Sequence, residues 1–221
     1  MLDRSRRHHA TGARWYRRKD RAFMARLIRR FLLFQVLFAT LAAAQTIYFP
    51  DKAFSDDSRL DKFTRDWYSG QLKALEEPSL RARSKDTSLQ SYRFVWLRTF
   101  HHPIAIRVDV RKDGTSIVTT KVASGAGGYR PGKLVEHKTA ALTLEQTQDL
   151  VAKISLEGFW GLSAYLAEGG GCDGSEWIIE GSKDGKYHVV TRWSPTNGLI
   201  YELGIAFIGL AHLSIPSKEM Y

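Results

Sequence analysis

Cys172 and His188 are the residues of this chain that could serve as nucleophile and base in covalent catalysis. Cys172 is the only cysteine and follows three glycines at 169–171, whose backbone amides would suit an oxyanion. However, the cysteine precedes a predicted strand, whereas a reactive thiol is usually activated by a helix N-terminus or a neighbouring cation. The pattern therefore favours a thiol that is inert, or that forms a disulfide with another molecule, over a catalytic thiol.

Histidines are the candidate metal ligands. Adjacent histidines on a strand point to opposite faces, so His101 and His102 cannot simply chelate one ion together. No H-x-x-x-H or H-E-x-x-H spacing occurs. The sequence therefore predicts no metal site and no other cofactor. The alternative is a metal site in which His137 and His188 join His101 or His102, with Asp109 or Glu176 as an oxygen ligand.

The segment 127–133 (GGYRPGK) matches the G-x-x-x-x-G-K core of a phosphate-binding loop. Leu134 follows it, where a hydroxyl is needed to hold magnesium, and Pro131 removes one backbone donor. Predicted strands lie on both sides, so no helix N-terminus would point at a phosphate. A hairpin loop explains this segment better than a nucleotide site.

The stretch 169–195 is the most patterned part of the chain. It is predicted to form a glycine-rich loop, a strand over 175–182, an Asp184-Gly185 turn and a strand over 186–193. Alternation places Trp177 on one face and Glu176 with Glu180 on the other. If one face is open, tryptophan and arginine beside the loop would form a small binding groove. The candidate ligand-binding residues are Gly170, Gly171, Cys172, Asp173, Trp177, His188 and Arg192.

The net charge of +10 is concentrated at the N-terminus. Residues 1–30 hold eleven basic and two acidic side chains, which leaves 22 basic and 21 acidic side chains for the rest of the chain. A nucleic-acid-binding domain needs a basic face of its own, because phosphate neutralisation supplies most of its affinity. The near-neutral remainder therefore argues against nucleic acid as a partner.

An uncharged apolar run at 31–44 (FLLFQVLFATLAAA) follows three arginines and ends in alanines. This order is typical of a secretory signal with cleavage near Ala44, and Met24 would then be the natural start. The alternative is an uncleaved anchor over 31–50 that holds the domain at the inner membrane. Both alternatives place the domain outside the cytoplasm, either periplasmic or secreted after cleavage, or anchored and periplasmic.

The remaining elements predict an α+β fold, in which a mainly antiparallel sheet of about six strands has helices packed on it. Residues 45–90 are expected to form a helix and a polar linker over 79–90, and residues 91–221 the α+β domain. The first helix is expected to begin at a Ser58–Asp61 capping box. Its expected docking stripe is Leu60, Phe63, Trp67, Leu72 and Leu75, with a partner-binding helix as the sharper alternative.

Two further helices are expected. One begins at a Thr143–Gln146 capping box. The other begins at Ser194-Pro195 and is apolar nearly all round, with Gly204 and Gly209 allowing close approach to the sheet.

The patterns D-G-x-x-W-x-x-E-G at 173–181 and Y-H-x-V-x-R-W-S-P at 187–195 span the predicted hairpin. They resemble a group of uncharacterised exported bacterial proteins, and the resemblance covers roughly residues 92–213. The resemblance implies a small α+β domain outside the cytoplasm, and it implies no activity.

The sequence as a whole indicates an exported, non-enzymatic binding domain of the bacterial envelope, with an envelope protein, a peptide or a small ligand as partner. The alternative is a hydrolase or metal-dependent enzyme that uses His101, His102, His188 or Cys172.

Overall fold

The computed structural model describes residues 46–156, 158–166, 171 and 173–221. Residues Ile47–Tyr221 form one compact unit. The predicted leader, the start at Met24, the cleavage point at Ala44 and the site residues Gly170 and Cys172 lie outside the described residues. Within the described part, no helix is both long and apolar enough to cross a membrane.

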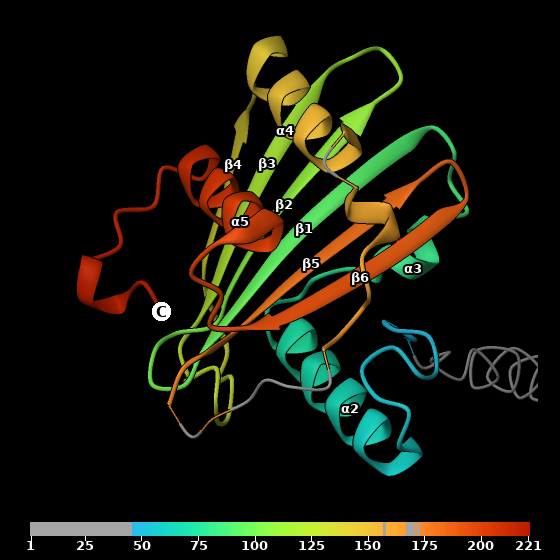
Figure 1. The fold of residues 1–221 in the computed structure, drawn as a ribbon. Helices are drawn as coiled ribbons and strands as arrows, with labels where there is room; N and C mark the ends of the chain where they lie inside the picture. The colour runs from blue at the N-terminus through green and yellow to red at the C-terminus, as the bar shows by residue number, and fades with distance from the viewer. Residues whose placement is uncertain (1–45, 157, 167–170, 172) are drawn as a thin grey trace, which may run out of the picture. The chain divides into compact units, whose positions relative to one another are not determined.

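A six-stranded antiparallel sheet forms the centre of the unit, which confirms the predicted α+β class and strand number (Figure 1). The strand order is β4-β3-β2-β1-β5-β6, so β4 and β6 are the edges. The strands are β1 Leu89–Arg98, β2 Ile104–Arg111, β3 Ser116–Ala123, β4 Leu134–Ala141, β5 Ser175–Lys183 and β6 Lys186–Trp193.

Helices cover both faces of this sheet. Figure 1 shows α4 and α5 on one face, and their apolar side chains join one core cluster with β1, β2 and β5. Side chains of α2 join a second cluster on the other face. The helices are α2 Ser58–Ala74, α3 Leu80–Arg83, α4 Leu144–Leu156 and α5 Gly198–Leu210, and two 3-10 turns are Phe159–Gly161 and Ser217–Glu219.

The first face has an aromatic centre. Phe94, Trp96 and Trp177 are fully buried, and their ring centroids lie 5.0–6.1 Å apart. Gly204 brings α5 directly onto this cluster, because a Cβ there would overlap the ring of Trp177. The prediction of a close approach is therefore confirmed at Gly204. It is wrong at Gly209, where a Cβ would meet nothing within 4 Å.

The second face carries a buried charge network beside its apolar cluster. Arg93 donates from Nε to Glu180 Oε2 at 2.8 Å and from Nη1 to Glu77 Oε2 at 3.1 Å. Glu77 also pairs with Lys121 at 3.2 Å and with Arg107 at 3.5 Å. Burial opposes the ionisation of Glu77, but these three cations lower its pKa below the ordinary value. Charge pairing thus helps hold this face together.

The start of α2 differs from the predicted capping box. Asp57, rather than Ser58, is the N-cap, and its carboxylate accepts hydrogen bonds from two backbone N–H groups of the first turn. Asp61 instead accepts hydrogen bonds from the backbone N–H groups of Lys52 and Phe54. Asp61 therefore holds the loop that precedes the helix instead of capping it. A capping-box pattern, which considers only residues of the helix start, cannot predict this role.

The docking face of α2 also differs from prediction. Leu72 and Leu75 are buried as expected, but Leu60 and Phe63 are exposed. Tyr68 is buried in their place, with its ring 4.9 Å from that of Phe54. The helix is therefore rotated so that part of its apolar stripe faces solvent.

Two boundaries also differ. Residues 79–90, expected as a linker, contain α3 and the start of β1, because the Ser79 hydroxyl caps α3 and Leu80 is fully buried. The last helix begins at Gly198 instead of Ser194-Pro195. The Ser194 hydroxyl accepts a hydrogen bond from the backbone N–H of Ser175, which ties residue 194 to the start of β5.

Candidate binding groove

The predicted site residues do not gather at one point. Trp177 is 1% exposed in the core, and its indole N–H donates to the Ser175 hydroxyl at 2.8 Å. His188 lies under the 3-10 turn, with Nε2 3.1 Å from the Leu162 carbonyl, and burial lowers its pKa. Gly171 and Asp173 are exposed in the loop before β5. Only Arg192 of the described candidates lines the groove discussed below.

The histidines proposed for metal chemistry are also separated in the fold. His101 Nδ1 lies 2.7 Å from the Tyr221 hydroxyl, whereas His102 Nδ1 lies 2.8 Å from the Gly125 carbonyl. No group of three His, Cys, Asp or Glu side chains in the described residues could hold a metal ion. Cys172 lies outside these residues.

The two glycine-rich loops meet at the end of β1. The backbone N–H of Thr99 donates to the Gly174 carbonyl at 2.9 Å, and the backbone N–H of Gly128 donates to the Thr99 carbonyl at 3.2 Å. A Cβ at Gly127 would lie 2.6 Å from the Cα of Leu97. The 125–132 loop is therefore packed against β1, and it leads into strand β4.

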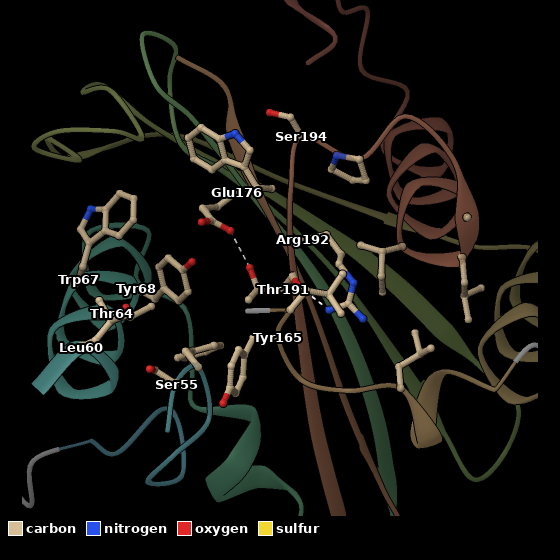
Figure 2. A pocket seen from close by; sticks show the side chains of 18 of the residues that line it. Ser55, Leu60, Thr64, Trp67, Tyr68, Tyr165, Glu176, Thr191, Arg192 and Ser194 are labelled. Atoms are coloured by element: carbon tan, nitrogen blue, oxygen red, sulfur yellow. Dashed lines mark hydrogen bonds between the residues drawn. The ribbon is translucent and has the colours of Figure 1, made fainter. Parts of the chain in front are cut away.

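A groove of about 850 Å³ lies between α2 and β6. We call it the α2–β6 groove. Figure 2 shows Leu60, Thr64, Trp67 and Tyr68 of α2 on one side, facing Thr191 and Arg192 of β6. The residues 162–166 and the segment 193–200 that leads into α5 complete the lining.

The floor of the groove is polar. Glu176 is half-buried and accepts a hydrogen bond at Oε2 from the Thr191 hydroxyl at 2.7 Å. The Tyr68 hydroxyl points toward Glu176 in Figure 2. Burial raises the pKa of Glu176, only partly offset by these two hydroxyl groups. Burial, and then the nearby Glu176 carboxylate, raise the pKa of Tyr68 well above its ordinary value.

The rim of the groove is apolar and open to solvent. Leu60, Phe63 and Leu166 are 55%, 67% and 56% exposed. Leu60, Phe63 and Trp67 follow an i, i+3, i+7 spacing, which places them on one face of α2. Exposed apolar side chains gathered around a cavity are typical of an interaction site.

Trp193 lines the groove and also lies next to Gly171 and Gly174, which precede β5. It pairs directly with Glu176 in the β5–β6 register, so the two side chains are neighbours on one face. A Cβ at Gly174 would lie 2.6 Å from Cζ2 of Trp193, and one at Gly171 would lie 3.2 Å from its Nε1. Gly171 and Gly174 thus lie against the indole that borders the groove.

Sequence reasoning missed the role of Glu176 and Tyr68. The sequence offers Glu176 as an oxygen ligand for a metal and places it with Glu180 on one face of the hairpin, but it gives neither a role in a groove, and Tyr68 is not on the predicted stripe of α2. The signal available was the hairpin register, because counting back from Asp184-Gly185 places Glu176 opposite Trp193. The contact with α2 could not be derived, since it joins segments about a hundred residues apart.

Comparison with known proteins gives no family. Neither a scan against protein-family models nor a search of curated proteins returned a match.

Proposed function

We propose that this chain is an exported, non-enzymatic binding domain whose α2–β6 groove binds an extended, apolar peptide segment of another envelope protein. The observation that carries the proposal is the exposed rim of Leu60, Phe63 and Leu166 around a cavity of about 850 Å³. A volume of this size lies within the range of roughly 300–1,000 Å³ that is usual for ligand sites.

The two walls favour a peptide over a compact small molecule. One wall is a helix and the other is β6, an edge strand of the sheet. The backbone N–H of Thr191 donates to the Ala164 carbonyl at 2.7 Å, so the outer side of β6 already forms a backbone hydrogen bond with another segment of the chain. Helix grooves and strand edges are both common sites of peptide recognition.

The proposed location rests on the leader. Residues 31–44 favour export with cleavage near Ala44, leaving a periplasmic or secreted domain, and an inner-membrane anchor over 31–50 is the alternative. N-terminal sequencing of the exported protein would give a start at Gln45 if cleavage occurs. An intact N-terminus in the membrane fraction would favour the anchor.

Selection of peptides from a randomised library displayed on phage tests the binding proposal. Selected peptides are labelled with fluorescein, and their affinity for the purified full chain is measured by fluorescence anisotropy. Trp67→Ala is expected to weaken binding at least about tenfold, because buried aromatic anchors usually dominate such interfaces. Leu144→Ala is the matched control, because Leu144 is 63% exposed on α4, away from the groove.

The control variant is expected to change affinity less than about twofold, which is below 0.5 kcal/mol. Circular dichroism confirms that both variants are folded. A library that yields no binding peptide, or peptides whose affinity is unchanged in the folded Trp67→Ala variant, would overturn the proposal.

A further inference from the structure

Acidic side chains dominate the charge presented by the α2–β6 groove. Three charged residues line it: Asp56, Glu176 and Arg192. Arg192 donates from Nη1 to the Thr191 carbonyl at 2.7 Å and from Nη2 to the Ser163 carbonyl at 3.0 Å. These bonds hold the guanidinium against the backbone without neutralising its charge, so the groove presents one cation and two carboxyl groups.

Glu176 has no cationic partner in the described part of the chain. Its carboxylate lies beside the hydroxyl groups of Thr191 and Tyr68, and no Lys or Arg side chain forms an ion pair with it there. Elsewhere on the same face, the buried carboxylates of Glu77 and Glu180 are matched by Arg93. A half-buried carboxylate without a cation is costly, and such groups often mark sites that a ligand completes.

Aromatic rings surround this carboxylate. Trp193 lies directly opposite Glu176 in the strand register, and the Tyr68 hydroxyl points toward it. Trp67, next to Tyr68 in α2, also lines the groove (Figure 2). A cation over the face of tryptophan or tyrosine is attracted by the ring, by roughly 0.5–2 kcal/mol depending on solvent exposure.

We infer that the groove selects peptides with a lysine or arginine side chain, whose charged head pairs with Glu176 between Trp193 and the aromatic residues of α2. The apolar stem of such a side chain would lie along the exposed rim of Leu60 and Phe63. The inference rests on the proposed function, because it names the kind of peptide that the groove would bind.

Burial independently raises the pKa of Glu176 and so opposes its ionisation in the free protein. A bound cation would favour the ionised form, so binding of a basic peptide is expected to weaken as the pH falls and the carboxyl group is protonated.

The test uses the purified full chain and one selected peptide in two synthetic forms. The first form keeps its lysine or arginine, and the second replaces that residue with norleucine, which keeps an apolar stem without the charge. The basic form is expected to bind at least about tenfold more tightly, which corresponds to about 1.4 kcal/mol. Glu176→Gln is expected to abolish this difference while leaving the affinity for the norleucine form within about twofold.

Glu145→Gln is the matched control, because Glu145 is exposed in the first turn of α4 and does not line the groove. It is expected to preserve the difference between the two peptide forms. Melting curves show whether each variant is folded.

The results distinguish a failure of the cation selection from a failure of the proposed function. If the selected peptides lack basic residues, or if both forms bind equally to the wild-type chain, the selection of a cation is overturned. Trp67→Ala would still weaken binding in that case, and the proposed function would stand. If Trp67→Ala in its folded state also has no effect, the proposed function itself fails.

Discussion

Arg93→Met tests whether the buried charge network stabilises the fold. Arg93 is fully buried, donates to Glu180 and Glu77, and also donates from Nη1 to the Pro78 carbonyl at 2.7 Å. Methionine keeps much of the side-chain volume but removes the charge. Both carboxylates would then lose their shared cation in a site that excludes water.

Removal of one partner from a buried ion pair typically costs about 3–5 kcal/mol, because the other charge is left uncompensated. Arg93 bridges two carboxylates, so we expect the upper half of this range, about 4–5 kcal/mol. Lys121 and Arg107 still pair with Glu77, which limits the loss on that side. In a domain of this size the change corresponds to a lower Tm by roughly 8–20 °C.

Urea unfolding followed by circular dichroism measures this free energy of unfolding. Arg111→Met is the matched control, because Arg111 is an exposed arginine at the end of β2 and is expected to change stability by less than about 0.5 kcal/mol. The loss in Arg93→Met should shrink on acidification, because protonation removes the charge of Glu180, which is left without a cation and whose pKa is raised by burial. A loss below about 1 kcal/mol at neutral pH, or one that does not change with pH, would refute this reasoning.

Three further predictions concern stability. Glu176→Gln should stabilise the fold at neutral pH and have little effect in acid, because burial raises the pKa of Glu176 and its favourable contribution is lost as pH rises through that pKa. Urea unfolding at two pH values measures this. Glu77 has a lowered pKa, so its contribution should be lost as pH falls through that pKa, and Glu77→Gln should flatten this acid limb in an unfolding titration. Gly204→Ala should cost about 1–3 kcal/mol by crowding Trp177, whereas Gly209→Ala should stabilise α5 by about 0.5–1 kcal/mol, and thermal melts compare the two.

The sequence predicted the strands and turns well because these features depend on residues that are close together in the chain. The Asp184-Gly185 turn joins β5 and β6 as expected, with positive φ at both residues. The Thr143–Gln146 capping box is also confirmed, since each residue's side chain accepts a hydrogen bond from the other's backbone N–H. Such features depend on residues within a few positions of one another.

The groove depends on contacts that the sequence does not encode locally. The spacing of Leu60, Phe63 and Trp67 is the same whether α2 buries them or leaves them exposed. Which face is buried depends on tertiary contacts such as those of Tyr68, which packs in the cluster beneath the sheet with residues distant in the sequence. The buried ion pairs were missed for the same reason, because Arg93 and Glu180 become partners only once β1 and β5 lie side by side.

The location of a bound peptide tests the central claim most directly. A selected peptide that carries a benzophenone group would be irradiated in complex with the full chain, and the cross-linked tryptic fragments identified by mass spectrometry. We predict cross-links to α2 and to residues 162–166, the helix wall and the rim of the groove. Cross-links confined to β4 or α4 would contradict the claim that the α2–β6 groove is the binding site.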